Sequence, residues 1–320
     1  MGAEVKKIPW VKKQPVMGTV LRAIAPLVIF SLYLYGWRAL LIFLTTNLTA
    51  YATEYFFTRR RGEPVTEAVF VTGSLLALSL PPGVPLWIAA VGAVVGIAFG
   101  KELFGGFGRN LFNPALVGRA FIFVSFPSQI TGAWYEPLRG PIAGFIFYGP
   151  HEAVTGATPL AAMASGGGRD LIDLIIGRIP GCIGESSAVL VILGGLYLLY
   201  KKVASREIVI SALVTYFAAA VLCYLMGWGA PLNPVYAIFA GGLLFGVFFM
   251  ATDPVSAVAS KEGKVAYGAI IGLSILLIRN FGNFPEGTMF AILLGNTFGP
   301  IAEMGVKGLK SLRAPEGAHE

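Results

Sequence analysis

The stretch Gly100–Phe121, GKELFGGFGRNLFNPALVGRAF, carries a charged pair and a glycine-rich turn directly before an apolar segment. Asn is a favoured N-cap and Pro a favoured first helical residue, so Asn113-Pro114 predicts a helix that begins at Pro114. The amides of a helix start attract electron-rich groups. Asn110 and Asn113 are therefore candidates to bond the carbonyl and imide groups of a flat heterocycle, although capping alone would explain them equally well.

On both sides of this stretch the composition is that of a membrane protein. Of 320 residues, 56% are hydrophobic and only 13% are charged, whereas roughly a quarter of the residues in a soluble domain are charged. A spanning helix needs about 20 apolar residues. The sequence offers ten candidate segments, at Val20–Tyr35, Ala39–Phe57, Glu67–Leu80, Leu86–Gly100, Pro114–Phe126, Ser187–Tyr200, Ile208–Met226, Val235–Met250, Val265–Ile278 and Thr288–Met304. These segments predict an all-α integral membrane protein.

Basic residues indicate the orientation of these segments. Seventeen lie in the tails and connections on the side of the N-terminus, and five lie on the opposite side. Cytoplasmic loops carry the excess of Lys and Arg in membrane proteins. We therefore expect both termini in the cytoplasm and the long loop 127–186 outside. The basic residues cluster at the ends of apolar runs rather than on one soluble face, which argues against a nucleic-acid partner.

The membrane part divides into two halves that are weakly alike. GSLLALSLPP (Gly73–Pro82) is similar to GGLLFGVFFMATDP (Gly241–Pro254), and GRNLFNPALVGRAF (Gly108–Phe121) to RNFGNFPEGTMFAI (Arg279–Ile292). The partners run in opposite directions, as in an inverted repeat with interrupted helices; chance similarity between glycine-rich apolar sequences is the alternative. The expected organisation is a cytoplasmic tail, a five-helix repeat, the outer loop, a second five-helix repeat and another cytoplasmic tail, over residues 1–18, 19–126, 127–186, 187–305 and 306–320.

Charged side chains within or beside the expected spans are costly in hydrocarbon and are functional candidates. Glu54 and Asp253 are the candidates for an ion path. An acidic residue at a helix C-terminus opposes the helix dipole, so Asp253 needs another reason for its position; capping of the following turn is the alternative. Arg119 stands five residues after Pro114. The two cysteines and two histidines lack the spacing of a zinc or iron–sulfur site, so we predict neither a metal nor a catalytic residue.

The outer loop holds Thr155-Gly156-Ala157-Thr158-Pro159. Gly and Ala leave the backbone uncovered, and Pro159 disfavours a helical conformation at Thr158. The pattern therefore presents the Thr158 hydroxyl on an extended segment that suits covalent modification. Taken alone, a turn of small residues is the simpler interpretation.

Three strings in this order, GKELFGGFGRNLFNPALVGRAF, TGATPL and MATDPVSA, resemble the RnfD/NqrB family of flavin-carrying membrane subunits. The resemblance covers the chain from about the third expected span to the tenth. It implies FMN joined through its phosphate to the Thr158 hydroxyl by a separate flavin transferase. The transferase motif would comprise Thr155, Gly156, Ala157 and Thr158 together with Glu152, which stands where the family usually has an aspartate.

The resemblance also implies a non-covalent riboflavin near Asn110 and Asn113, with Arg119 as a further candidate contact. Chain length favours the Rnf branch of the family. This branch implies a prokaryotic inner-membrane subunit of an ion-translocating ferredoxin:NAD oxidoreductase, which passes electrons through FMN and is not catalytic alone. Its transport would be of Na⁺ or H⁺, and its partners would include another flavin subunit and iron–sulfur subunits.

Two alternatives remain open. The alternative within the family is the NqrB subunit of a sodium-translocating NADH:quinone reductase, since the GRNLF and ALVGRAF motifs are shared with that branch. In a different class, it is a urea- or ammonium-like channel without a redox cofactor. The channel interpretation leaves the outer TGAT segment without a purpose.

Overall fold

The computed structural model describes residues 9–138, 140, 143–148, 159–164, 167, 170–185, 187–229, 232–282 and 287–313. The first half contains β1 (Val11–Lys12), α1 (Pro15–Tyr35), α2 (Trp37–Arg61), β2 (Val65–Thr66), α3 (Ala68–Ser79), α4 (Leu86–Gly100), the 3₁₀ helix η1 (Glu102–Phe104) and α5 (Pro114–Ser125). Short helices follow: α6 (Pro127–Thr131), α7 (Ala143–Ile146), α8 (Pro159–Ala164) and α9 (Leu171–Ile176). The second half contains α10 (Ala188–Tyr200), α11 (Arg206–Met226), α12 (Pro234–Phe239), α13 (Leu243–Phe245), the π-helix η2 (Gly246–Met250), α14 (Lys261–Phe281) and α15 (Thr288–Arg313).

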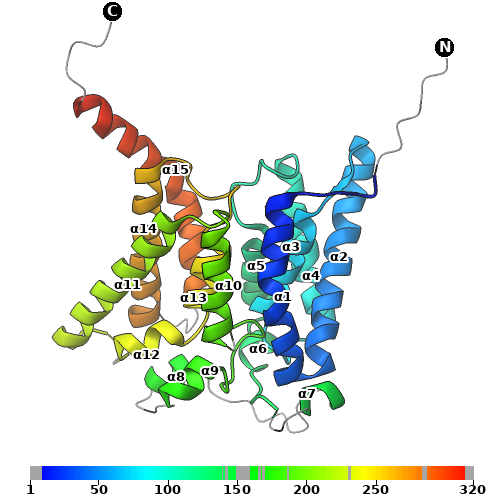
Figure 1. Cartoon of the computed structure of the whole chain (residues 1–320), viewed down its shortest axis with the longest axis horizontal. Helices are drawn as coiled ribbons and strands as arrows, with labels where there is room; N and C mark the ends of the chain where they lie inside the picture. Colours follow the sequence, from blue (N-terminus) through cyan, green and yellow to red (C-terminus); the bar gives the residue numbers. More distant parts are fainter. Residues whose placement is uncertain are drawn as a thin grey trace, which may run out of the picture.

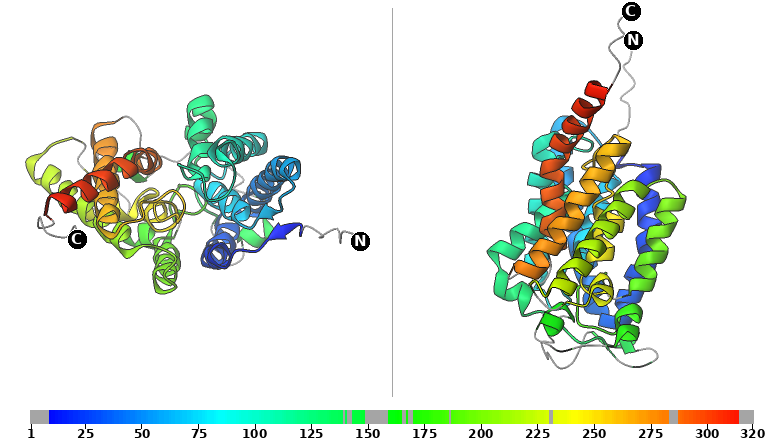
Figure 2. Two further views of the ribbon diagram at one scale, coloured as in Figure 1. Left: turned by 90° about the horizontal axis from the view of Figure 1, so that it is seen from above. Right: turned by 90° about the vertical axis from the view of Figure 1, so that its left-hand side faces the viewer.

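The long helices form two groups that stand side by side, α1–α5 and α10–α15 (Figure 2). The short helices α6–α9 lie at one end of the molecule, whereas β1 and the end of α15 lie at the other (Figure 1). In the first group α4 packs on α5 and α2 packs on α4, and in the second α14 packs on α15 and α11 packs on α14. Outside the helices, the described residues include the two-residue parallel pair of β1 with β2.

The prediction of an all-α membrane protein is confirmed in two respects. The chain is mostly helical, and it contains helices that are long and apolar enough to cross a membrane. Five helices among the described residues are long and apolar enough to cross a membrane: α1, Leu86–Phe104, α11, α14 and Thr288–Gly308. Helices α3, α5 and α10 are apolar but shorter. Each of the ten expected intervals contains helix, but the number of crossings and the inverted repeat remain predictions.

The eighth expected interval, Val235–Met250, is broken inside. Helix α12 ends at Phe239, and the chain turns through Gly241, whose φ of +56° favours glycine,. It then re-enters the bundle as α13 and η2. A π-helix is rare and is found frequently at functional sites.

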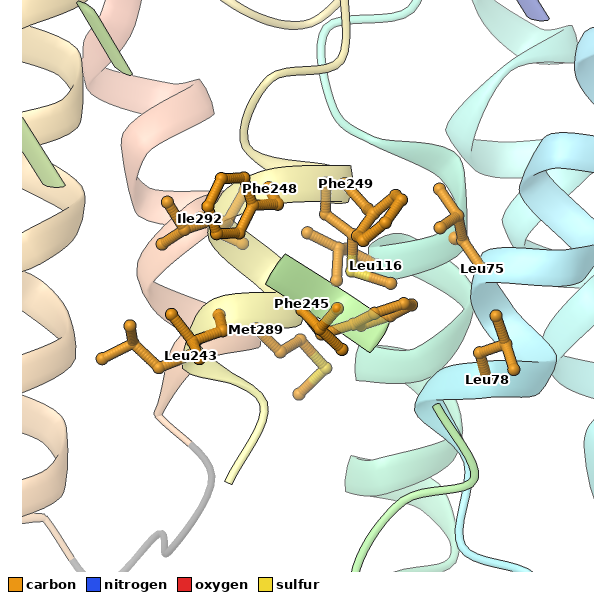
Figure 3. Packing of buried hydrophobic residues seen from close by; sticks show 14 of the residues in the cluster. Leu75, Leu78, Leu116, Leu243, Phe245, Phe248, Phe249, Met289 and Ile292 are labelled. Carbon is orange, nitrogen blue, oxygen red and sulfur yellow. The ribbon is translucent and has the colours of Figure 1, made fainter. Parts of the chain in front are cut away.

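The residues after the break form the centre of the molecule. Phe245 and Phe249 have ring centroids 5.4 Å apart. Figure 3 shows them between Leu75 of α3 and Leu116 of α5 on one side and α15 on the other. This broken element therefore packs against both halves.

Helices α4 and α5 approach each other closely through glycine. A Cβ added at Gly118 would overlap the carbonyl oxygen of Gly92, and one added at Gly96 would come within 2.6 Å of the carbonyl oxygen of Pro114. We expect Gly118→Ala to lower the free energy of unfolding by about 1–3 kcal/mol, because an extra methyl in a closely packed contact forces the helices apart. The readout is the thermal unfolding midpoint of the purified protein in detergent.

Gly305→Ala is the matched control for this substitution. Gly305 lies in α15, and an added Cβ there meets nothing within 4 Å. Since Ala favours a helix interior over Gly by about 1 kcal/mol, its midpoint should stay the same or rise. Equal midpoints for the two variants would show that the α4–α5 contact is looser than described.

Candidate ion and cofactor site

Asn113 connects the start of α5 to the second half. Its Oδ1 accepts hydrogen bonds from the backbone N–H groups of Ala115 (3.0 Å) and Leu116 (3.4 Å), so the predicted N-cap is confirmed. Its Nδ2 donates to the Met250 carbonyl oxygen at 3.3 Å, and its backbone N–H donates to Asn296 Oδ1 at 3.3 Å. The amide group is thus engaged by the protein at both ends, which favours the capping interpretation over ligand binding.

A cavity lies beside this cap, between the two halves. Its polar lining comes from Thr72, Lys101, Asn110, Asn113, Thr252 and Asp253. Its apolar lining includes Phe107 from the first half and Phe249 from the second. The cavity volume is about 50 Å³, which holds a few water molecules. Of the predicted site residues, it brings together Asn110, Asn113 and Asp253.

Asn110 is buried, and its Nδ2 donates to the backbone carbonyl of Phe112 at 3.1 Å. This local bond fixes the side chain in the turn before α5. An amide has two N–H donors and an acceptor oxygen, so Asn110 retains bonding capacity beyond this contact. It is a better candidate than Asn113 for contact with a molecule in the cavity.

Asp253 has the capping role considered for it, whereas its place on an ion path remains a prediction. Its Oδ1 accepts from the Val255 N–H at 3.3 Å and its Oδ2 from the Ser256 hydroxyl at 2.9 Å, so it caps the turn after η2. It also lines the cavity. Burial raises the pKa of Asp253, and the hydrogen bonds from Val255 and Ser256 oppose that rise. The carboxyl therefore holds a proton to higher pH than an exposed aspartate, so that proton and cation would compete for it.

Glu54 is fully buried and has a partner that the sequence did not identify. Its Oε2 lies 2.5 Å from Lys101 Nζ, and its Oε1 accepts from the Thr66 backbone N–H at 2.8 Å. Lys101 is 2% exposed and also donates to Thr66 Oγ1 at 2.7 Å. Lys101 looks like a loop lysine in the sequence, yet it is a buried cation that lines the cavity.

A second ion pair lies next to the first. Glu102 is buried and its Oε2 pairs with the Arg61 guanidinium. Among the described residues, no hydrogen-bond donor reaches Glu102 Oε1. Arg61 also bonds the exposed Glu63 at 3.0 Å. Two buried carboxylates, Glu54 and Glu102, and two cations, Lys101 and Arg61, therefore lie close together in the first half.

Arg119 does not join this site. It is 7% exposed, and its Nη2 contacts Cys182 Sγ at 3.2 Å. It lies six residues after Asn113, about 9 Å along the helix axis, and is not one of the described residues that line the cavity. The structure therefore separates Arg119 from Asn110 and Asn113.

The transferase motif cannot be compared with the structure. Glu152, Thr155, Gly156, Ala157 and Thr158 lie outside the described residues. The covalent-FMN prediction at Thr158 therefore rests on the sequence.

Two segments that precede α10 meet the break in the second half. A Cβ added at Gly241 would overlap Leu160 of α8, and one added at Gly242 would overlap the Glu185 carboxylate. Leu160 is 4% exposed. Helix α8 is therefore held against the broken element.

Arg279 is a further residue whose role the sequence concealed. Its guanidinium donates to the carbonyl oxygens of Ala237 (2.8 Å), Ala240 (3.2 Å) and Gly241 (2.5 Å), and to Tyr216 Oη at 3.3 Å. These carbonyls belong to the last turn of α12 and the break after it. Arg279 is one of the five basic residues expected from the sequence on the side opposite the N-terminus, but it lies in α14 and is only 6% exposed. The similarity of RNFGN to GRNLFN was the available signal.

These features define a helical membrane protein with a polar cavity between two halves. A profile of the NQR2, RnfD, RnfE family matches residues 9–308, and the chain belongs to this family. It is 39% identical over 278 residues to the NqrB subunit of the Na(+)-translocating NADH-quinone reductase of Klebsiella pneumoniae subsp. pneumoniae, covering 81% of this chain and 64% of the relative. It is 41% identical over 264 residues to the same subunit of Ectopseudomonas mendocina, covering 78% and 62%.

The chain thus spans less than two thirds of the length of these relatives. Both are named as subunits of a quinone reductase. Together with the helices that are long and apolar enough to cross a membrane, they indicate a bacterial membrane protein. Their names favour the quinone-reductase alternative over the Rnf assignment that chain length suggested.

Proposed function

We propose that this chain is a flavin-carrying membrane subunit of an ion-translocating oxidoreductase of the NADH:quinone reductase type. The observation that carries the proposal is the cavity between the two halves, where Asp253, Lys101 and Asn110 meet in a chain of this family. A carboxylate at such an interface suits alternating access of a cation, since movement of one half exposes it to a different side. The Rnf-type complex is the second candidate, because the family includes RnfD.

The redox part of the proposal rests on the Thr155–Thr158 motif. FMN joined by a phosphoester to the Thr158 hydroxyl, after action of a flavin transferase, would supply electron transfer. Another flavin subunit and iron–sulfur subunits would be its electron partners. A covalent bond suits an outer loop, because it prevents loss of the cofactor into a compartment without free FMN.

A non-covalent riboflavin fits the cavity less well. The polar lining offers donors for carbonyl and imide groups, notably the Asn110 amide and Lys101. The volume of about 50 Å³ does not enclose a three-ring heterocycle with the side chains as they stand. We therefore assign no step to a second flavin.

The membrane arrangement belongs to the same proposal. We infer ten crossings in two inverted five-helix repeats, both termini in the cytoplasm and the α6–α9 end outside. The matching helix pairs of the two halves support the repeat, and the distribution of basic residues supports the orientation,. The membrane would be the bacterial inner membrane.

The test is purification of the intact complex through a tag on this chain. We expect co-purified redox subunits and a Na⁺-stimulated oxidation of NADH by a soluble quinone. Electron transfer between reduced ferredoxin and NAD, without quinone reduction, would support the Rnf branch instead. A chain that purifies without redox partners and without flavin would contradict both and favour the channel alternative.

A further inference from the structure

Lys101 lies between two carboxylates that belong to different halves of the molecule. On one side its Nζ contacts Glu54 Oε2 of α2 at 2.5 Å. On the other side it lines the same cavity as Asp253, which follows η2. The positive charge of Lys101 favours the ionised form of Asp253. Both carboxylates are therefore within the electrostatic reach of one ammonium group.

The charges around the cavity do not balance. Of the two charged residues that line it, Lys101 is already paired with Glu54, and among the described residues no ion pair is formed by Asp253. An ionised carboxyl that is partly shielded from water and has no cationic partner is unfavourable. A single monovalent cation at Asp253 would neutralise the group.

The Lys101 side chain is suited to change partners. An ammonium group has three N–H donors, and Glu54 and Thr66 accept two of them. Lysine is a compact charge on a flexible four-carbon stem, and Lys101 and Asp253 line the same cavity. Asp253 also offers acceptor capacity, since each carboxylate oxygen has two lone pairs.

We propose that Lys101 is an internal counter-ion that exchanges between Glu54 and Asp253 and so competes with the transported cation. This rests on the proposed function in taking Asp253 as part of the ion path. In the arrangement described, Lys101 pairs with Glu54 and leaves Asp253 able to receive a cation. When Lys101 turns to Asp253, it displaces the cation and replaces a contact within the first half by one between the halves. Ion occupancy is thereby linked to the fit of the two halves.

The first experiment measures binding of radioactive Na⁺ to the purified complex. Glu54→Gln removes the partner that holds Lys101 away from Asp253, so we expect Na⁺ binding to weaken by about tenfold, within the usual range of coupling between two sites. Glu54→Gln combined with Lys101→Met removes the competitor as well, so binding should be at least as tight as in the wild type. Asp253→Asn is the control that should abolish the binding.

A merely structural ion pair gives a different result. In that case both Glu54 variants would change Na⁺ affinity in the same direction or not at all, and the inference would be overturned. The double variant also guards against misfolding, because it leaves no unpaired buried charge at the Glu54–Lys101 pair.

The second experiment does not depend on which ion is carried. A double-mutant cycle combines Lys101→Met with Asp253→Asn in the Glu54→Gln background, with thermal unfolding of the complex in Na⁺-free buffer as the readout. We expect the changes in unfolding midpoint caused by the two substitutions to be non-additive. The departure from additivity should be smaller when Glu54 is present. Additive midpoints in both backgrounds would rule out the exchange. If the wild type binds no Na⁺ but the cycle shows coupling, sodium transport fails as a proposal while the role of Lys101 stands.

Discussion

A Thr158→Val variant, produced together with the flavin transferase, will give no fluorescent band on a denaturing gel under ultraviolet light. The wild-type chain produced in the same way will give a bright one. Valine is close to threonine in shape but lacks the hydroxyl oxygen, so no phosphoester can form. The effect is a complete loss rather than a reduction. Intact mass spectrometry provides the second readout, because only the wild type should carry the additional mass of FMN.

Thr131→Val is the matched control for this result. Thr131 belongs to the same connecting segment, residues 127–186, but lies outside the motif, and its hydroxyl donates to the Pro127 carbonyl at 2.9 Å. This variant should remain fluorescent, which separates loss of the attachment point from general damage to the loop. Fluorescence that persists in Thr158→Val would place the flavin elsewhere. If the wild-type chain gave no fluorescent band although the transferase modified another substrate, the covalent-FMN proposal would be wrong.

The features predicted correctly from the sequence depend on local chemistry. The start of α5 follows from an Asn that can cap and a Pro that can begin a helix, and the structure has Asn113 and Pro114 in those positions. The mostly helical membrane fold follows from long apolar runs. The break in the eighth interval was not predicted, because Val235–Met250 is expected from the sequence as one span, whereas the chain turns at Gly241 with a positive φ.

The features that were missed depend on contacts between distant parts of the chain. Lys101 meets Glu54 across 47 residues, and Arg279 meets Ala237 across 42. In the sequence both basic residues look like ordinary loop charges at the ends of apolar runs. The cost of burying Glu54 did require a partner, but nothing local identified Lys101. Arg119 likewise meets Cys182 across 63 residues, a contact that no local pattern indicates.

Arg279→Met will cause one of the largest losses of stability available in this chain. The guanidinium supplies the hydrogen bonds of Ala237, Ala240 and Gly241, whose carbonyl oxygens end α12 and begin the break. Each buried carbonyl left without a donor costs about 1–3 kcal/mol. The methionine also forfeits the cation–π contact of Arg279 with Tyr216, at 5.6 Å from the ring centroid. We therefore expect a loss above about 4 kcal/mol, a size seen only for such buried networks.

Two further variants test the cause of this loss. Arg22→Met makes the same substitution at an exposed position of α1, where the guanidinium bonds Gly18 and Thr19 of its own helix, and surface changes stay within about 0.5 kcal/mol. Arg279→Lys keeps the positive charge but lacks the planar fork that reaches several carbonyls at once, so it should recover only a minor part of the unfolding midpoint. If Arg279→Lys had the same unfolding midpoint as the wild type, a positive charge alone would be sufficient at this site. If Arg279→Met and Arg22→Met had the same unfolding midpoint, the carbonyl oxygens of α12 would have other hydrogen-bond donors in the variant. The broken element would then be held by the packing of its phenylalanines rather than by the arginine.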